Sequence, residues 1–202
     1  MNYRIKYPYH TVAKGIHRFF LSVLLAVAAA ASTGCISDEP GEADSESGIK
    51  AGDPLPEFSI STSDGTPVPS NSLDGKVSVL VFFRTTCPDC RAEFPVIEQL
   101  YGKYRYSDKV VILGISVGEP AADIAAYWNE HMLLFPYSPQ SDKLLAQETF
   151  GISSVPHIYI SDIYRTVRYV HGDDPLASFE ELDSEISALL GENSDGKDDI
   201  AG

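Results

Sequence analysis

The sequence has few cysteines. Only three occur in 202 residues, at Cys35, Cys87 and Cys90, which is too few for the disulfide framework of a small secreted scaffold. A structural zinc site normally needs four ligands in two spaced pairs, and here a single C-x-x-C pair is accompanied only by scattered histidines. We therefore predict no metal site, while two thiols and a distant histidine leave a copper-handling role open.

Basic residues are also scarce. Lysine and arginine total 15 against 29 aspartates and glutamates, so the formal net charge is −14. Nucleic-acid binding needs a basic patch that neutralises phosphates, and we therefore expect no nucleic-acid partner. The acidic residues concentrate towards the ends, since ten lie from Asp173 onward with only Lys197 against them. Such charge suits solvated tails or an acidic docking surface.

Long apolar runs are absent except for one near the N-terminus. The run from Phe19 to Ala31 is shorter than the roughly 20 residues that span a bilayer. It follows a basic stretch and precedes small residues, as in the apolar region of a secretory signal. The "STGC" that follows resembles a bacterial lipoprotein cleavage site, which implies lipidation of Cys35. We expect a lipoprotein-type signal peptide over 1–34, a disordered acidic tether over 35–50 and a disordered acidic tail over 192–202.

The patterning of residues 51–191 predicts one α/β domain. Alternating runs around an Asp-Gly turn predict a β-hairpin, and "VSVLVFF" and "VVILGISVG" predict buried strands. A helical pattern between these strands, from Pro88 to about Tyr104, completes a right-handed β-α-β unit. The remaining predicted elements are a helix from near Pro120, a short strand in 133–137, a helix over 141–151 closed by Gly151, two antiparallel strands in 157–172, and an amphipathic helix ending at Gly191. This order predicts a mixed sheet with helices on both faces.

Cys87 and Cys90 form a C-x-x-C motif between the first buried strand and its helix. A disulfide across so short a loop adds less stability than the roughly 3 kcal/mol of a 15-residue loop, so a structural staple is a poor explanation. Pro88 suits the first helical position, and the free N–H groups and dipole of that helix end stabilise a thiolate. We predict that Cys87 is the exposed nucleophile and Cys90 the buried resolving thiol.

The segment "FFRTTCPDCRAEFP" resembles the active-site segment of the TlpA/ResA-type thiol-disulfide oxidoreductases of the thioredoxin superfamily. The motif follows an apolar strand, Pro95 lies five residues after Cys90, and "SVP" over 154–156 matches the loop that carries the family's cis-proline. The resemblance covers about 51–191, including the opening hairpin. It implies a thioredoxin-like fold, with a central mixed β-sheet flanked by helices and an N-terminal β-hairpin extension.

The resemblance also implies roles for individual residues. Pro156 would be cis, and the Val155 backbone would pair with an incoming substrate strand beside the nucleophile. Pro88 and Asp89, between the two cysteines, join these two as substrate-binding residues. Glu93 matches a family glutamate close to the redox pair, where it could take the proton of the resolving thiol. A solvated helix glutamate is the alternative at that position.

Two positions depart from the family pattern, and a third bears on the direction of electron flow. Thr86 stands where the family usually has tryptophan, and Arg84 where it usually has a small residue. Arg84 would either lend positive charge to the thiolate or lie at the surface. Asp89 opposes the thiolate with its negative charge, which favours the disulfide form and makes the pair a better reductant. We therefore expect a reductase.

The sequence thus predicts an extracytoplasmic, lipid-anchored thiol-disulfide oxidoreductase that needs no cofactor beyond the redox-active disulfide of Cys87 and Cys90. The resemblance implies protein substrates with disulfides or thiols, a membrane electron donor of the DsbD or CcdA type, and a role in cytochrome c maturation or envelope thiol repair. One alternative is a thiol peroxidase, although that motif needs threonine or serine at the position of Arg84 and proline at that of Leu80. Another is a non-enzymatic lipoprotein that binds copper or a partner on the same scaffold.

Overall fold

A computed structural model describes residues 48–195, with side chains as far as residue 192. The predicted signal peptide, the lipidated Cys35 and most of the tether and tail lie outside the described residues. Among the described residues, no helix has the length and apolar character that a membrane crossing requires. The elements are, in order, β1 (Ser59–Ser61), β2 (Pro67–Pro69), the 3-10 helix η1 (Ser70–Leu73), β3 (Val77–Phe83), α1 (Pro88–Tyr104), β4 (Val110–Ser116), α2 (Ala121–His131), β5 (Tyr137–Ser138), the π-helix η2 (Leu145–Thr149), β6 (His157–Ser161), β7 (Val167–His171) and α3 (Phe179–Asp195).

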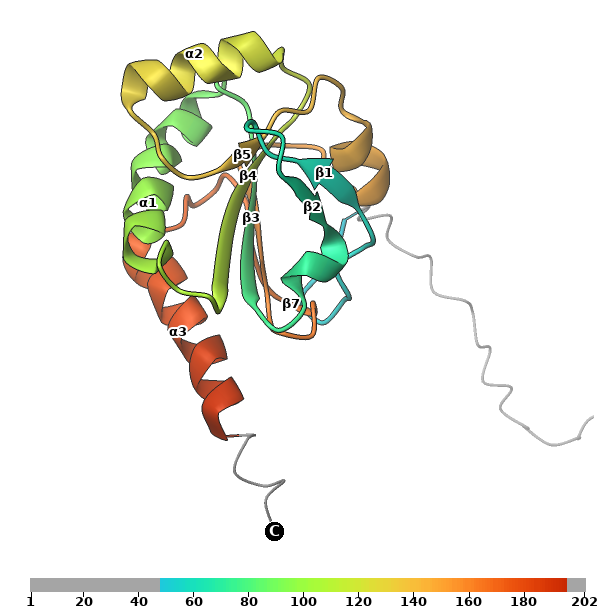
Figure 1. The fold of residues 1–202 in the computed structure, drawn as a ribbon, viewed down its shortest axis with the longest axis vertical. Helices are drawn as coiled ribbons and strands as arrows, with labels where there is room; N and C mark the ends of the chain where they lie inside the picture. The colour runs from blue at the N-terminus through green and yellow to red at the C-terminus, as the bar shows by residue number, and fades with distance from the viewer. Residues whose placement is uncertain (1–47, 196–202) are drawn as a thin grey trace, which may run out of the picture. The chain divides into compact units, whose positions relative to one another are not determined.

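A five-stranded sheet in the order β5-β4-β3-β6-β7 forms the centre of the domain (Figure 1). β3 runs parallel to β4, with Phe83 opposite Ser116, and antiparallel to β6. β4 is parallel to β5, and β6 is antiparallel to β7. The predicted mixed sheet is therefore confirmed. Every residue of β3 is buried, as expected of a central strand covered on both faces.

β1 and β2 form the predicted N-terminal hairpin as a separate antiparallel pair. The carboxylate of Asp64 accepts a hydrogen bond from the Thr66 N–H at 3.0 Å, and Gly65 has a φ of 84°, a conformation that glycine adopts without steric cost. The Ser63 N–H donates to the Tyr137 carbonyl at 2.8 Å. The hairpin is therefore joined to the β5 edge of the central sheet.

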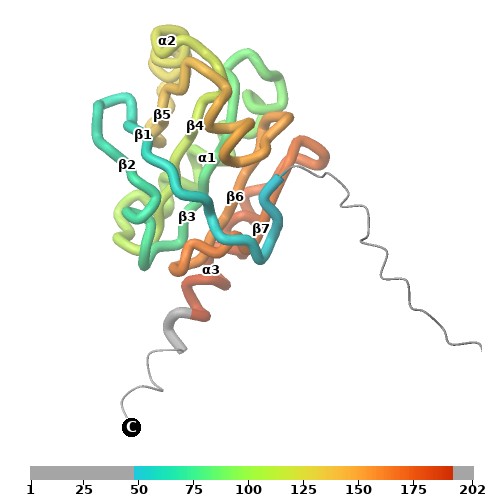
Figure 2. The backbone as a smooth tube through the Cα atoms, turned by 90° about the vertical axis from the view of Figure 1, so that its right-hand side faces the viewer, coloured from blue at the N-terminus to red at the C-terminus, as the bar shows by residue number. Residues whose placement is uncertain are grey.

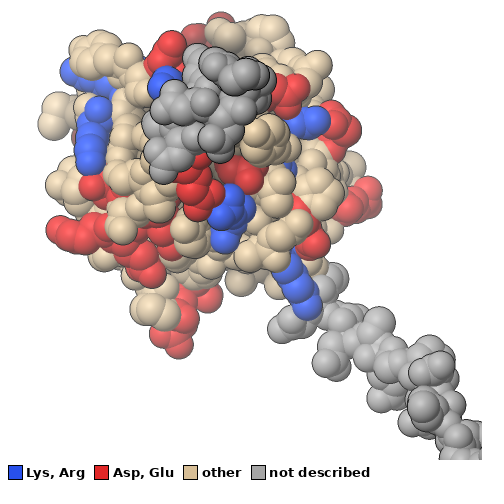
Figure 3. All heavy atoms as spheres, turned by 90° about the horizontal axis from the view of Figure 1, so that it is seen from below, with Lys and Arg blue, Asp and Glu red and all other residues tan. Residues whose placement is uncertain are grey.

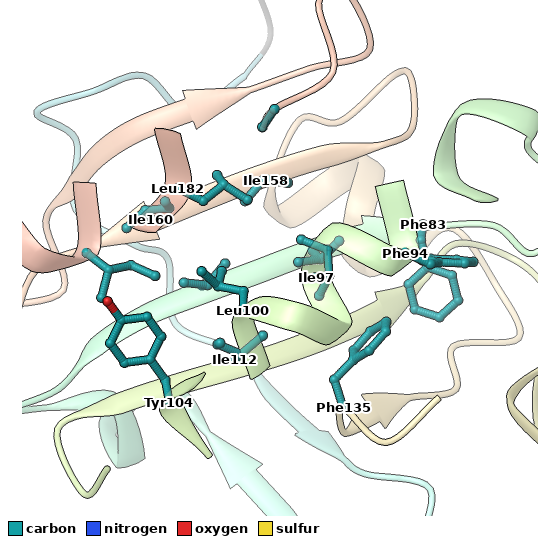
Figure 4. Close-up of a cluster of buried hydrophobic side chains, with 14 of the residues drawn as sticks. Phe83, Phe94, Ile97, Leu100, Tyr104, Ile112, Phe135, Ile158, Ile160 and Leu182 are labelled. Atoms are coloured by element: carbon teal, nitrogen blue, oxygen red, sulfur yellow. The ribbon is translucent and has the colours of Figure 1, made fainter. Parts of the chain in front are cut away.

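Different elements pack against the two faces of the central sheet (Figures 1 and 2). Residues of α1, α2 and α3 belong to one apolar cluster, and residues of the hairpin region and η2 belong to the other. Successive strand side chains point to opposite faces, so Val79 and Phe83 of β3 join the helical cluster while Leu80 and Phe82 join the second. Figure 4 shows the helical cluster, in which Ile97 of α1 lies over the sheet.

Two predicted elements between α2 and β6 differ from expectation. The strand predicted in 133–137 is the two-residue β5, which begins after Pro136 because proline has no N–H for a strand ladder. The helix predicted over 141–151 is reduced to η2, in which the Phe150 N–H donates to the Leu145 carbonyl at 3.2 Å. Gly151, with a φ of 65°, follows it, as the sequence predicts.

α3 continues to Asp195, beyond the end predicted at Gly191. Glu192 forms an ion pair with Arg168 of β7 at 2.9 Å, which fixes the helix past the glycine. Leu182, Ile186 and Leu189 are buried on one face of α3 as predicted. Acidic side chains predominate on the face of the molecule in Figure 3, with lysines and arginines interspersed among them.

Candidate active site

The loop between β3 and α1 places Cys87 at the start of the helix. Cys87 is the N-cap residue of α1, with an extended backbone of φ −80° and ψ 124°, and Pro88 follows at the first helical position. Its side chain is half-buried and carries a free thiol. A helix N-terminus offers unpaired N–H groups and partial positive charge. This position agrees with the predicted nucleophile.

The proline loop faces Cys87 from the other side of the site. The Val155–Pro156 peptide bond is cis, as the resemblance implies. The Cys87 thiol donates a hydrogen bond to the Val155 carbonyl, with 3.4 Å between Sγ and oxygen. Phe82 of β3 lies opposite His157 of β6 in the antiparallel register, and this pairing brings the two distant segments together. The Val155 backbone is therefore beside the reactive thiol.

Cys90 lies one helical turn further along α1 and is 1% exposed. Burial raises the pKa of its thiol far above the ordinary value, because the thiolate would lose its hydration. The charges of Cys87 and Glu93 raise it further, and a hydrogen bond with the Arg84 backbone acts in the opposite direction. The motif thus has one accessible thiol and one protected thiol that holds its proton firmly.

Glu93 is buried beside this second thiol and is 2% exposed. One carboxyl oxygen accepts a long hydrogen bond of 3.3 Å from the Ala177 N–H, and the other has no hydrogen-bond partner. Burial raises its pKa from 4.5 to about 7, against the lowering effects of the Ala177 N–H and of His171. The alternative of a solvated helix glutamate is therefore wrong. A carboxyl that titrates near neutrality suits proton transfer.

Glu119, which the sequence analysis did not single out, lies under the loop that precedes the motif and is 6% exposed. Its carboxylate accepts hydrogen bonds from the Thr85 N–H at 2.7 Å, the Thr85 hydroxyl at 3.0 Å, and the N–H and hydroxyl of Thr86, both at 3.2 Å. The carboxyl ends of parallel strands meet at one edge of a sheet, and Phe83 lies opposite Ser116 there. An acidic residue just after a buried parallel strand, in "SVGEP", is the signal that could have identified it.

Two arginines brace the same loop. Arg84 is half-buried, and its Nε donates to the Val117 carbonyl at 2.8 Å, so its guanidinium holds the end of the neighbouring strand instead of lying free at the surface. The Nε of Arg91 donates to the Thr85 carbonyl. Its guanidinium carbon also lies 5.5 Å from the centroid of the Tyr127 ring, within the range of a cation–π contact.

Pro88 and Asp89 are exposed on the first turn of α1, next to Cys87 in the chain, and their role in substrate binding stays a prediction. A groove of about 470 Å³ between α1 and α2 includes Arg91, Phe94 and Tyr127 in its lining. Because Arg91 also binds the loop before the motif, the groove begins close to the active site.

A possible set of metal ligands lies at the junction of β7 and α3. Ligand atoms of His171, Glu181 and Glu185 lie within 4.8 Å of one another, and the sequence did not indicate this cluster because its members come from two elements. His171 Nε2 lies 2.8 Å from a carboxylate oxygen of Glu185. This contact accounts for two of the three ligand atoms, and the absence of a metal site stays a prediction.

Comparison with known proteins identifies the family. Residues 51–170 match the AhpC/TSA family. The thioredoxin-like protein YneN of Bacillus subtilis is 29% identical over 129 residues, which cover 62% of this chain and 74% of YneN. The thiol-disulfide oxidoreductase ResA of Halalkalibacterium halodurans is 27% identical over 122 residues, which cover 60% of this chain and 68% of ResA.

Solved structures agree on the fold. A thiol:disulfide interchange protein of the thioredoxin family from Chlorobium tepidum superposes with a TM-score of 0.59 at 27% identity, over 70% of this chain and 98% of that one. A secreted disulfide oxidoreductase from Mycobacterium tuberculosis, at 23% identity, superposes with a TM-score of 0.57 over 65% of this chain and 96% of that one; this likeness shows the fold alone. The chain belongs to the AhpC/TSA family and is a thiol-disulfide oxidoreductase with a thioredoxin-like fold.

Proposed function

We propose that this protein reduces protein disulfides outside the cytoplasm, with Cys87 as nucleophile and Cys90 as resolving thiol. The observation that carries the proposal is the asymmetry of the pair. Cys87 is half-buried at a helix N-terminus and faces the Val155 carbonyl at 3.4 Å, whereas Cys90 is 1% exposed. Only the first thiol can meet a protein substrate, and the second can meet only the first.

In the first step, the thiolate of Cys87 attacks one sulfur of a substrate disulfide. A new S–S bond joins Cys87 to the substrate, the substrate's own S–S bond breaks, and its second sulfur leaves as a thiolate that takes up a proton. The backbone of Val155 pairs with an extended substrate segment in the manner of an added strand. Pro88 and Asp89, exposed beside the nucleophile, contact the same segment.

In the second step, Cys90 loses its proton and attacks the Cys87 sulfur. Glu93 accepts that proton, since it is buried beside the thiol, has an oxygen without a hydrogen-bond partner, and has a pKa raised by burial to about 7. The mixed disulfide breaks and the remaining substrate sulfur leaves and is protonated. Two electrons have then passed from the cysteine pair to the substrate, and the reaction needs no further cofactor.

The proposed location rests on the N-terminal sequence. The apolar run followed by "STGC" supports export and a lipid anchor on Cys35. The oxidised pair would be returned to the dithiol by a membrane donor of the DsbD or CcdA type. Cytochrome c maturation is the process that the resemblance to the TlpA/ResA proteins favours.

Trapping tests the mechanism. Cys90→Ser keeps the nucleophile but removes the resolving thiol, so it should accumulate mixed disulfides with protein substrates, visible on non-reducing gels and released by dithiothreitol. Cys87→Ser is the matched control and should trap nothing, because the remaining thiol is buried. The wild-type protein should reduce insulin disulfides. If neither adducts nor insulin reduction occurs, the proposal fails.

Further measurements determine the direction of electron flow and distinguish the proposed reductase from the two alternative functions. A reduction potential of about −270 mV would match thioredoxin-type reductants, whereas about −120 mV would mark an oxidant. Turnover of hydrogen peroxide would indicate a thiol peroxidase. Stoichiometric Cu(I) binding without disulfide turnover would indicate a non-enzymatic binding protein.

A further inference from the structure

We propose that Glu119 is a positioning residue that holds the loop before Cys87 in place and, through its fixed negative charge, biases the cysteine pair towards the disulfide. This inference rests on the reductase function proposed above. It assigns a second buried carboxylate to the site, with a role different from that of Glu93.

Glu119 accepts four hydrogen bonds from the loop before the motif. Four donors, two from Thr85 and two from Thr86, converge on its two oxygens at 2.7–3.2 Å. Oε1 accepts three of these bonds and Oε2 accepts one, so each carboxylate oxygen has at least one donor. Bonds to a charged acceptor are also about twice as strong as neutral ones. Glu119 is therefore held in one place by the loop that it binds.

Glu93, in the same site, has far fewer hydrogen-bond partners than Glu119. It is 2% exposed and has one long bond of 3.3 Å and one oxygen without a partner, so its environment favours the protonated form. The two buried carboxyl groups thus differ in their hydrogen-bond partners, and we assign them different roles. Glu93 transfers the proton, and Glu119 supplies fixed charge and geometry.

The loop held by Glu119 leads directly to the nucleophile. Thr86 precedes Cys87 in the chain, and the Cys87 N–H donates to the Arg84 carbonyl at 3.2 Å, closing a tight turn. Glu119 holds this turn through its N–H groups and hydroxyls, and Arg91 holds the Thr85 carbonyl from the helix side. Threonine at position 86 supplies two of the four donors, which gives a physical role to the residue that replaces the family's usual tryptophan.

The charge of Glu119 acts on the redox equilibrium. When two electrons and one proton are added to the disulfide, the reduced pair has a thiol on Cys90 and a thiolate on Cys87, whose neighbour in the chain, Thr86, binds the Glu119 carboxylate. The disulfide carries no such charge, so repulsion between the carboxylate and the thiolate disfavours the reduced form. The four donors offset part of this repulsion. The pair thereby becomes a stronger reductant of its substrates.

The test is the equilibrium of the purified protein with glutathione, followed by separating the disulfide and dithiol forms. Glu119→Gln removes the charge and should shift the equilibrium about fivefold to twentyfold towards the dithiol; a tenfold shift corresponds to about 30 mV. Thr85→Val removes one donor at a buried position, leaves the carboxylate less neutralised, and should shift the equilibrium about twofold to fivefold towards the disulfide. Glu130→Gln, an exposed residue of α2, is the matched control and should leave it unchanged.

The opposite directions of the two shifts separate charge from simple support of the loop. If Glu119 only supported the loop, both substitutions would shift the thiol–disulfide equilibrium in the same direction, or neither would shift it. Either result overturns the proposal. If Glu119→Gln does not fold, the Thr85→Val variant alone tests the proposal. The role of charge is then refuted if the equilibrium of Thr85→Val does not shift, or shifts towards the dithiol. The measurement involves no protein substrate. Opposite shifts without any adduct of the Cys90→Ser variant would retain this inference and reject the protein reductase.

Discussion

At the scale of single residues, Glu93 should make the stability of the protein depend on pH. Burial raises its pKa from 4.5 to about 7, so the folded protein binds this proton more tightly than the unfolded chain. The contribution to stability is present below about pH 4.5 and is lost as the pH rises to about 7. Glu93→Gln should therefore increase the free energy of unfolding of the dithiol form by about 2–3 kcal/mol at pH 8.5, and by less than about 0.5 kcal/mol at pH 4. Urea titrations at the two pH values check it.

The same variant should lose activity where it gains stability. A positioned proton acceptor contributes about 100-fold or more to a rate, so resolution of the mixed disulfide by Cys90 should slow in Glu93→Gln. Glu130→Gln, exposed on α2, should change neither property. A stability difference that is the same at both pH values would show that Glu93 does not titrate in this range.

The residues of the site differ in how far the sequence alone could reveal them. Cys87, Cys90 and Glu93 lie within the first two turns of α1, so local spacing is enough to group them. Pro156 was recognised from its resemblance to the family loop. Glu119 lies more than thirty positions from Thr85, and only the parallel register of β3 and β4 joins the two. Local patterns do not contain that register, which depends on the pairing of whole strands.

At the scale of elements, β4 has no room for a side chain at Gly114. A Cβ there would lie 2.9 Å from a ring carbon of Phe83 and 3.1 Å from one of Phe135. Overpacking of a close-packed core costs about 1–3 kcal/mol, so Gly114→Ala should destabilise the protein by that amount. Gly102 offers the same chemical change on α1, where a Cβ meets nothing within 4 Å. Because alanine is the better helix former, Gly102→Ala should stabilise the protein by about 0.5–1 kcal/mol.

Thermal and urea unfolding of the Gly114→Ala and Gly102→Ala variants measure these two changes in stability. The opposite signs are the result to look for, since the two substitutions are chemically identical and differ only in their surroundings. Destabilisation by Gly102→Ala, or tolerance of Gly114→Ala, would contradict the described packing of α1 or of β4.

The elements that the sequence placed well are those with strong local periodicity. The run of seven buried residues in β3 and the bounds of α1 agree with prediction. The sequence predicts β5 and the end of α3 less well, because contacts with distant parts of the chain define them. β5 is two residues long and pairs with β4 at Gly114 and Ile115. α3 continues past Gly191 to Asp195, and Arg168 forms an ion pair with Glu192 in this last part of the helix.

At the scale of the whole molecule, strands of the central sheet contribute residues to both apolar clusters. Alternate residues of β3 belong to the helical cluster and to the cluster under the hairpin, so damage to either should unfold both. Phe150 tests the second cluster, since it is fully buried with its ring 4.8 Å from that of Phe82 and 5.6 Å from that of Phe58. Ile97, also fully buried, tests the first.

Phe150→Ala should reduce the free energy of unfolding by about 3–5 kcal/mol, and Ile97→Ala by about 2–5 kcal/mol, from lost burial and the cavity left behind. In urea, each should move the midpoint of one transition without changing its slope, because both clusters are exposed in the same event. Tyr164→Ala, at a side chain 79% exposed, should stay within about 0.5 kcal/mol of wild type. If near-ultraviolet circular dichroism and the far-ultraviolet signal of Phe150→Ala gave separate midpoints, the hairpin face would be an independent unit. The loop that positions Cys87 would then depend on the helical cluster alone, since Phe83 at the end of β3 belongs to that cluster.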